Sequence, residues 1–183
     1  MTGRKEGRTM VGDGSSAGEA VRDEERGRLM EGAVRNDEQK KGGEDRETLY
    51  MEIESRSRNE EFARVAAAVF ISRLDPTLEE IDDVKTAVSE AVTNAVIHGY
   101  GKQDGIIYIQ VIIEGQTVSV EVRDKGAGIA DVKKAMEPMY TTDTTGERSG
   151  MGFSFMEAFM DDVQVISAPG QGTCVTMKKR IGR

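Results

Sequence analysis

Residues 77–100 decide how the chain folds, and they end with Ser89-Glu-Ala-Val-Thr-Asn-Ala-Val-Ile-His-Gly-Tyr100. The stretch opens with Thr77-Leu-Glu-Glu80, a capping-box pattern that is typical of a helix N-terminus. Apolar residues then recur at helical spacing and predict one buried face: Ile81, Val84, Val88, Val92 and Ala95. We therefore expect a long helix from Leu78 to His98, with Gly99 as its left-handed C-terminal residue.

A polar stripe runs along the same helix. Glu90 and Asn94 are four residues apart and so lie side by side, roughly 120° or more from the centre of the buried face. Ala87 and Ala91 flank them with little bulk, which leaves room for another group against the stripe. A Glu-x-x-x-Asn spacing by itself also fits a helix face that is turned to water.

The segment before this helix predicts a strand and a second helix. Leu49–Ile53 reads as the strand, and Asn59 is a candidate N-cap for the helix. Asp75-Pro76 would end that helix, because proline cannot continue one. Its apolar positions follow helical spacing and are expected to face the core: Phe62, Val65, Ala66, Val69, Phe70 and Leu74.

The segment after the long helix predicts two hairpins and a further helix. Ile106–Ile113 and Thr117–Arg123 form the first hairpin, Met151–Met160 is the helix, and Val163–Ser167 with Gly172–Lys179 is the last hairpin. This order predicts an α+β fold, a two-layer sandwich in which a mixed, mostly antiparallel sheet carries helices on one face.

Two glycine-containing boxes follow the first hairpin. Asp124-Lys-Gly126-Ala-Gly128 comes directly after a strand, where glycines allow a close approach of the backbone and an aspartate can accept a hydrogen bond from an adenine amino group. A strand-ending turn closed by the Asp124 side chain would explain the same residues. Neither a P-loop nor a dinucleotide fingerprint is present in the sequence.

The second box, Glu147-Arg-Ser-Gly-Met-Gly-Phe153, opens the helix that begins at Met151. Backbone N–H groups at a helix N-terminus favour phosphate, and Arg148 would reach a terminal phosphate. The preceding residues 138–149 are rich in threonine, including Thr142, as a mobile lid over a ligand would be. An ordinary flexible loop is the alternative interpretation.

The amino-acid composition limits which classes of protein this chain can belong to. Residues 1–47 contain no aromatic residue and nine of the 21 glycines, so we expect a disordered extension before a folded domain at residues 48–183. Cys174 is the only cysteine, which excludes an internal disulfide and a cysteine–histidine zinc cluster. The pI near 4.9 argues against nucleic acid as the main partner, and no apolar run is long enough to span a membrane. A cytoplasmic protein is therefore expected.

The ordered set of boxes resembles the ATPase superfamily of gyrase, heat-shock chaperones and sensor histidine kinases. The stretches Phe62-Ala-Arg-Val65, Ser89–Tyr100 and Glu147–Phe153 are similar to the small anti-sigma factor serine kinases, in particular the anti-sigma F family of spore-forming bacteria. The similarity covers about Thr48 to Lys179. It implies a cytoplasmic, homodimeric anti-sigma factor that inhibits a sporulation sigma factor and thereby regulates transcription.

The resemblance also implies an ATP:protein serine kinase that phosphorylates an anti-anti-sigma antagonist. Glu90 would be the general base, Asn94 the Mg²⁺ ligand, Arg148 the residue that steadies the γ-phosphate, and Arg64 a partner contact. Further nucleotide-binding positions would be Asp124, Gly126, Gly128, Thr142, Gly150, Gly152 and Thr173.

Several alternatives stay open from the sequence. A non-catalytic, nucleotide-gated binding module, a simple ATPase, or a switch kinase of another sigma pathway would carry the same motifs. A phosphohistidine mechanism would have to use His98, the only histidine, for which a structural role at a helix end is the competing interpretation. Arg64 also fits a solvated helix position. Residues 1–47 are either a regulatory tail or an untranslated upstream stretch, with the true start near Leu49 or Met51.

Overall fold

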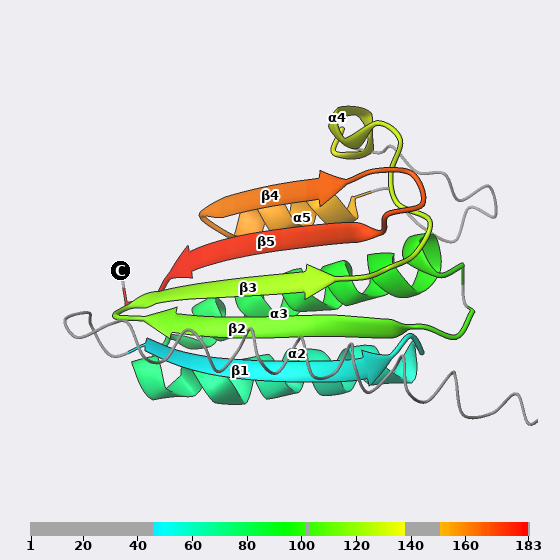
Figure 1. Cartoon of the computed structure of the whole chain (residues 1–183). Helices are drawn as coiled ribbons and strands as arrows, with labels where there is room; N and C mark the ends of the chain where they lie inside the picture. Colours follow the sequence, from blue (N-terminus) through cyan, green and yellow to red (C-terminus); the bar gives the residue numbers. More distant parts are fainter. Residues whose placement is uncertain (1–45, 102, 138–150, 183) are drawn as a thin grey trace, which may run out of the picture. The chain divides into compact units, whose positions relative to one another are not determined.

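The computed structural model describes residues 46–101, 103–137 and 151–182. Five strands form one sheet in the order β1-β2-β3-β5-β4 (Figure 1). All pairings among these strands are antiparallel. Their bounds are Arg46–Glu54 (β1), Ile106–Glu114 (β2), Thr117–Arg123 (β3), Asp162–Ser167 (β4) and Thr173–Arg180 (β5).

Three helices, α2 (Arg58–Ile71), α3 (Leu78–Asn94) and α5 (Gly152–Phe159), lie against one face of the sheet (Figure 1). The short helix α4 (Val132–Ala135) lies at the end of the sheet beside β4. This is the predicted α+β two-layer sandwich. None of the helices in the described part of the chain has the length and apolarity that a membrane crossing requires.

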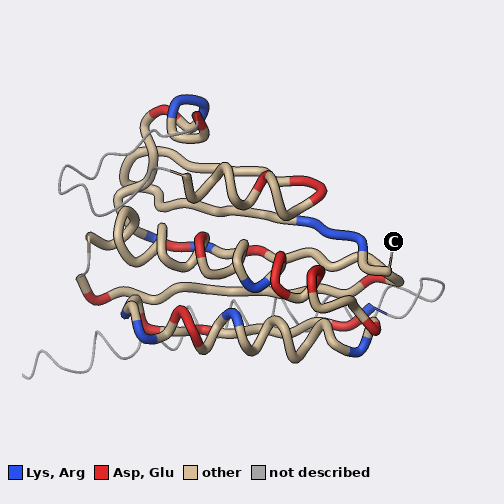
Figure 2. The backbone as a smooth tube through the Cα atoms, turned by 180° about the vertical axis from the view of Figure 1, so that it is seen from behind, with Lys and Arg blue, Asp and Glu red and all other residues tan. Residues whose placement is uncertain are grey.

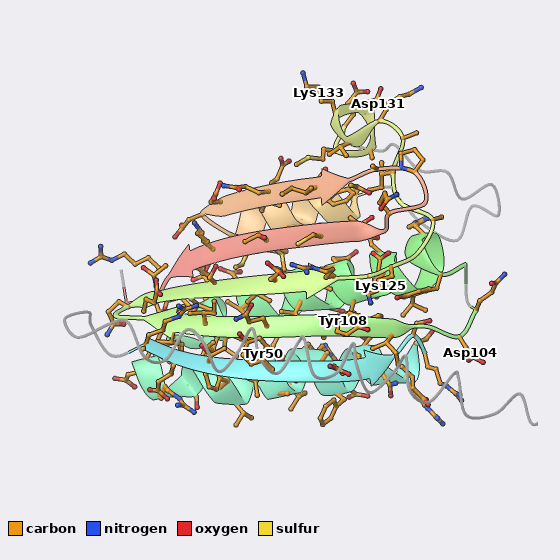
Figure 3. The ribbon with its side chains drawn as sticks, viewed as in Figure 1. Tyr50, Asp104, Tyr108, Lys125, Asp131 and Lys133 are labelled. Carbon is orange, nitrogen blue, oxygen red and sulfur yellow. The ribbon has the colours of Figure 1, made fainter. Side chains whose placement is uncertain are left out.

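The core fills the space between the sheet and the helices. Ile107, Ile109 and Val111 of β2 and Val118 and Val120 of β3 point into this layer, because alternate residues of a strand face the same side. The opposite face of the sheet carries Tyr50, Tyr108 and Lys125 (Figure 3). There the Lys125 ammonium lies 5.3 Å from the centre of the Tyr108 ring.

Helix α3 begins as predicted. The Thr77 side chain accepts a hydrogen bond from the Glu80 N–H at 3.1 Å, and the Thr77 N–H donates to Glu80 Oε2 at 2.8 Å. This reciprocal pair satisfies two of the backbone donors that a helix N-terminus leaves without partners. The predicted buried face is largely confirmed, since Val84, Val88, Val92 and Ala95 are buried.

The prediction for α2 is wrong in two respects. Ser57, not Asn59, is the N-cap residue, because the Asn59 side chain donates instead to the Glu54 carbonyl oxygen at the end of β1. The fully buried residues of the helix are Ala63, Ala67 and Ile71, and of the predicted set Phe70 and Leu74 also pack against the core. Three residues of the predicted core face are exposed on the opposite side of the helix: Phe62 (60%), Val65 (46%) and Val69 (67%).

The C-terminal end of α3 also differs from the prediction. The helix passes into a π-helical turn, η2 (Ala95–Gly99), in which the Tyr100 N–H donates to the Ala95 carbonyl oxygen. Gly99 does not have a positive φ; Gly101 does, at +60°. Gly99 lacks a side chain for another reason, because a Cβ atom there would lie 2.8 Å from Oδ1 of Asp124.

Candidate functional site

The polar stripe of α3 meets the N-terminus of α5. A Cβ atom on Gly152 would lie 3.0 Å from Oε2 of Glu90 and 3.3 Å from Nδ2 of Asn94. Glu90 and Asn94 are both half-buried, on consecutive turns of α3. The Glu-x-x-x-Asn motif and the second glycine of the downstream box, which are about 60 residues apart in sequence, therefore form one cluster.

The space expected beside the stripe is filled by the chain itself. Ala87 and Ala91 lie on the same side of α3 as Glu90 and Asn94, at about 100° per residue. Both alanines are buried, and α5 packs against α3. Their small side chains thus allow α5 to lie close to α3.

Asp124 is buried beyond the C-terminal end of α3, beside η2. Its Oδ1 accepts a hydrogen bond from the Gly126 N–H at 2.8 Å, and its backbone N–H donates to the Thr173 carbonyl oxygen. The carboxyl group packs against Gly99, five residues beyond Asn94. The π-helical turn η2 therefore connects the Asp124 carboxyl group to the Glu90–Asn94 pair at the end of α3.

Burial raises the pKa of Asp124 above its ordinary value of 3.8, and hydrogen bonds from the backbone of Gly126 and Thr173 partly oppose this effect. Removing the carboxylate from water disfavours its charged form, while N–H donors stabilise that form. A buried carboxyl group with a raised pKa is a common feature of functional sites.

The two glycines after Asp124 are required by the protein's own backbone. A Cβ atom on Gly126 would lie 2.1 Å from the Gly99 carbonyl oxygen. Gly128 has a φ of +70°, and its Cβ atom would lie 2.0 Å from the Ala168 carbonyl oxygen. The Ala127 N–H donates to the Gly99 carbonyl oxygen, which fixes this turn to the end of η2.

Two residues around Asp124 were not anticipated from the sequence. Ser167 Oγ accepts from the Ile129 N–H, donates to the Gly172 carbonyl oxygen and lies 3.0 Å from Thr173 Oγ1. The Tyr100 hydroxyl donates to the Ile106 carbonyl oxygen and accepts from the Lys125 N–H. Ser167 joins β4 to the glycine turn, and Tyr100 joins η2 to it. A serine in a strand and a tyrosine after a helix give no local signal of these contacts.

Comparison with known proteins assigns this arrangement to a family. The family model described as "Histidine kinase-like ATPase domain" matches residues 53–179. An anti-sigma F factor of Thermoanaerobacter sp. (strain X514) is 56% identical over 128 residues, which are 70% of this chain and 90% of that protein. An anti-sigma F factor of Clostridium novyi (strain NT) is 58% identical over 134 residues, 73% of this chain and 94% of that protein. The chain belongs to the anti-sigma F factor family.

A solved structure supports the fold of this anti-sigma F family member. The crystal structure of the RsbU and RsbW domains of a protein from Mycobacterium tuberculosis aligns with a TM-score of 0.54 and 20% identity. The alignment covers 75% of this chain and 32% of that one. At this identity the similarity concerns the fold alone.

Within this anti-sigma F fold, the structure brings together most of the predicted site residues. Glu90, Asn94 and Gly152 form one cluster, and Asp124, Gly126, Gly128 and Thr173 form a second at the other end of the π-turn. Thr142, Arg148 and Gly150 lie outside the described residues. Arg64, the predicted partner contact, pairs with Glu60 and Glu61 on its own helix.

Proposed function

We propose that this protein is an anti-sigma factor and an ATP-dependent protein serine kinase. It would bind and inhibit a sporulation sigma factor, and it would phosphorylate an anti-anti-sigma antagonist on a serine. The observation that carries this proposal is the contact of Gly152 with Glu90 and Asn94, because it joins a potential base, a potential metal ligand and a helix N-terminus. The names of the relatives support the sigma-factor partner.

Glu90 is proposed as the general base. Its carboxylate would take the proton from the hydroxyl group of the antagonist's serine as the serine oxygen forms a bond to the γ-phosphorus of ATP. The bond between that phosphorus and the β–γ bridging oxygen breaks, and ADP leaves with the electron pair. Phosphoryl transfer depends mainly on alignment and charge neutralisation. The Glu90 carboxylate would align the serine hydroxyl group, and the N-terminus of α5 would help to neutralise the phosphate charge.

Asn94 is proposed as the protein ligand of Mg²⁺, through its side-chain oxygen. A carboxamide oxygen suits a hard cation that keeps several water ligands. The donor set fits, since Asn94 lies beside Glu90 at the N-terminus of α5. Bound Mg²⁺ would supply charge neutralisation to the phosphate oxygens of the nucleotide.

The cluster around Asp124 is proposed to bind the adenine. Asp124 would accept a hydrogen bond from the adenine amino group, assisted by the Thr173 hydroxyl, while Gly126 and Gly128 shape the turn beneath the base. The backbone N–H groups at Gly150 and Gly152, together with Thr142 and Arg148, would bind the triphosphate. Two observations support this role for Asp124: its carboxyl group is buried, and its Oδ1 already accepts a backbone hydrogen bond.

Helix α2 is proposed as the interaction surface. Its exposed apolar stripe of Phe62, Val65 and Val69 supports a homodimer, because a contiguous exposed apolar patch commonly marks a protein–protein interaction site. Arg64 is the proposed sigma-factor contact, and its ion pairs with Glu60 and Glu61 would be exchanged for a partner carboxylate. The assembly would act in the cytoplasm.

Incubation of the protein with γ-labelled ATP, Mg²⁺ and a candidate antagonist tests the proposal. We expect one labelled serine, and no label when that serine is replaced by alanine. A non-catalytic binding module would bind ATP and the sigma factor without transferring label, and a simple ATPase would release labelled phosphate to water. Either result would contradict the kinase proposal.

A further inference from the structure

Lys179 is a lysine on the core side of the sheet. It shares the inward face of β5 with the buried residues Val175 and Met177, and only 13% of its side chain is exposed. It belongs to the basic run that Figure 2 shows at the C-terminal end of β5, where the neighbouring Lys178 faces solvent. Burying an ammonium group is costly unless charged and polar partners surround it, so these partners indicate what Lys179 holds in place.

The Lys179 ammonium joins two helices to the sheet. It lies 3.0 Å from Oδ2 of Asp83 on α3, and it donates a 2.8 Å hydrogen bond to the Phe159 carbonyl oxygen at the last residue of α5. A positive charge at the C-terminus of a helix is favourable, because the carbonyl groups there carry the negative end of the helix dipole. Two further bonds hold the chain after α5 to β5, from the Asp161 N–H to the Lys178 carbonyl oxygen and from the Arg180 N–H to Asp161 Oδ2.

Asp83 lies on the functional face of α3. Residues seven positions apart complete nearly two turns and share a helix face, so Asp83 is aligned with Glu90, with Ala87 between them. Seven positions also separate Gly152 from Phe159 on α5. Each span corresponds to a rise of about 10 Å, and α5 therefore runs antiparallel to α3, with its N-terminus at Glu90 and its C-terminus at Asp83.

We propose that Lys179 is a positioning residue for phosphoryl transfer, which fixes the register of α5 along α3 and so holds the N-terminus of α5 against Glu90 and Asn94. The inference rests on the proposed kinase function. Lys179 itself would not contact the nucleotide. Between the two contact points lie the fully buried Met156 of α5 and Ala87 of α3, and the charged contact at the far end adds a directional constraint on the register to this apolar packing.

The test compares binding of ATP with binding of adenosine. Lys179→Met keeps the aliphatic stem and removes the charge, and Lys179→Arg keeps the charge. Lys178→Met on the same strand is the matched control, since its side chain is exposed. Calorimetry would give both affinities, the urea midpoint would report folding, and steady-state phosphorylation would separate kcat from the KM for ATP.

We expect Lys179→Met to lose ATP affinity several-fold while its adenosine affinity stays at the wild-type value. Its kcat should fall about 10- to 100-fold, the scale of a small misplacement of reacting groups. Lys179→Arg should recover most of the loss, and Lys178→Met should match the wild type. The affinities for ATP and adenosine should respond differently because only ATP has phosphates that would reach the N-terminus of α5.

Equal losses of ATP and adenosine affinity in Lys179→Met, or wild-type ATP affinity and kcat in a folded Lys179→Met, would overturn the inference. If Lys179→Met does not fold, the single variants Asp83→Asn and Lys179→Arg provide the test. We expect Asp83→Asn to lower kcat, as Lys179→Met would, and a wild-type kcat in Asp83→Asn would refute the proposal. A wild-type protein that transfers no phosphate refutes the kinase function alone, because the two affinities still test the register of α5.

Discussion

Gly152 lies so close to Glu90 that a Cβ atom on the glycine would be 3.0 Å from the carboxylate oxygen Oε2. A glycine at the first position of α5 is otherwise unfavourable, because alanine is a better helix former by up to about 1 kcal/mol. The proximity of α5 to the polar stripe of α3 therefore explains why a helix begins with glycine here. It is also the relationship on which the proposed chemistry depends.

Gly152→Ala should reduce kinase activity more than it reduces stability. The added methyl group would displace Glu90 or the α5 N-terminus by a few tenths of an ångström, and we expect kcat to fall about tenfold or more. The free energy of unfolding should change by less than about 1 kcal/mol, because the helix-forming gain of alanine offsets the strain. Phosphorylation kinetics and urea unfolding measure the two effects.

Glu157→Ala, at an exposed position of the same helix, is the control and should leave both quantities unchanged. An active Gly152→Ala variant with wild-type kcat would show that the N-terminus of α5 does not need its close approach to Glu90.

Gly128→Ala should be more destabilising than Gly101→Ala. Both glycines have a positive φ, +70° and +60°, so each alanine incurs a left-handed penalty of about 1–2 kcal/mol. Only the Cβ atom at residue 128 would meet backbone, 2.0 Å from the Ala168 carbonyl oxygen, whereas nothing lies within 4 Å at Gly101. We expect the clash to add about 1–3 kcal/mol in urea unfolding. Equal losses would argue against the tight turn.

The pH dependence of stability should contain a contribution from Asp124. Its folded-state pKa is raised by burial, so the native state binds this proton more tightly than the unfolded state does. The contribution of Asp124 to stability therefore decreases as pH rises from its ordinary value of 3.8 through the raised folded value. We expect the unfolding free energy of the wild type, relative to Asp124→Asn, to fall as pH rises above 3.8 and to level off once pH exceeds the raised folded-state pKa.

Urea unfolding at several pH values measures this difference, with Asp104→Asn as the control for removing one exposed carboxylate (Figure 3). A relative stability that rises with pH would contradict the burial of Asp124 in the native state.

Phe62→Ser should weaken self-association without unfolding the monomer. Phe62 is 60% exposed and belongs to the apolar stripe of α2, which we propose to be covered in a homodimer. Light scattering over a range of concentrations should show a higher dissociation constant, with an unchanged urea midpoint under conditions where both proteins are monomeric.

Ala67→Ser is the matched comparison, because Ala67 is fully buried on the same helix. It should lower the free energy of unfolding by about 1–3 kcal/mol. A Phe62→Ser variant that dimerises as tightly as the wild type would remove α2 from the interface.

The sequence predicted the elements well where local chemistry determines them. The capping box at Thr77 and Glu80 defines the start of α3, and Thr117–Arg123 matches β3. Helix α2 shows where pattern reasoning fails. Phe62, Val65 and Val69 have the spacing of a core face, yet the alanines at 63 and 67 pack inward, because close approach of α2 favours small side chains. Apolar residues that face a partner protein and apolar residues that face the core recur along a helix with the same period, so the sequence pattern cannot tell them apart.

The site was predictable as a set of motifs but not as a set of contacts. Glycines at 126 and 128 suggested space for a ligand, while the atoms nearest their absent Cβ positions belong to the backbone of Gly99 and Ala168. Gly99 was expected to be left-handed, but its partner is the Asp124 carboxyl group, 25 residues away. Such long-range packing leaves no local signal, which is also why Ser167, Tyr100 and Lys179 were missed.

The phosphorylation rate of the Glu90→Gln variant tests the central claim most directly. Glutamine keeps the size of the side chain and cannot accept the serine proton, so a single-turnover assay with labelled ATP and the antagonist should show a rate lower by about 10²- to 10⁴-fold. ATP affinity, measured in parallel, should remain close to that of the wild type. Serine phosphorylation by Glu90→Gln at the wild-type rate would contradict the account.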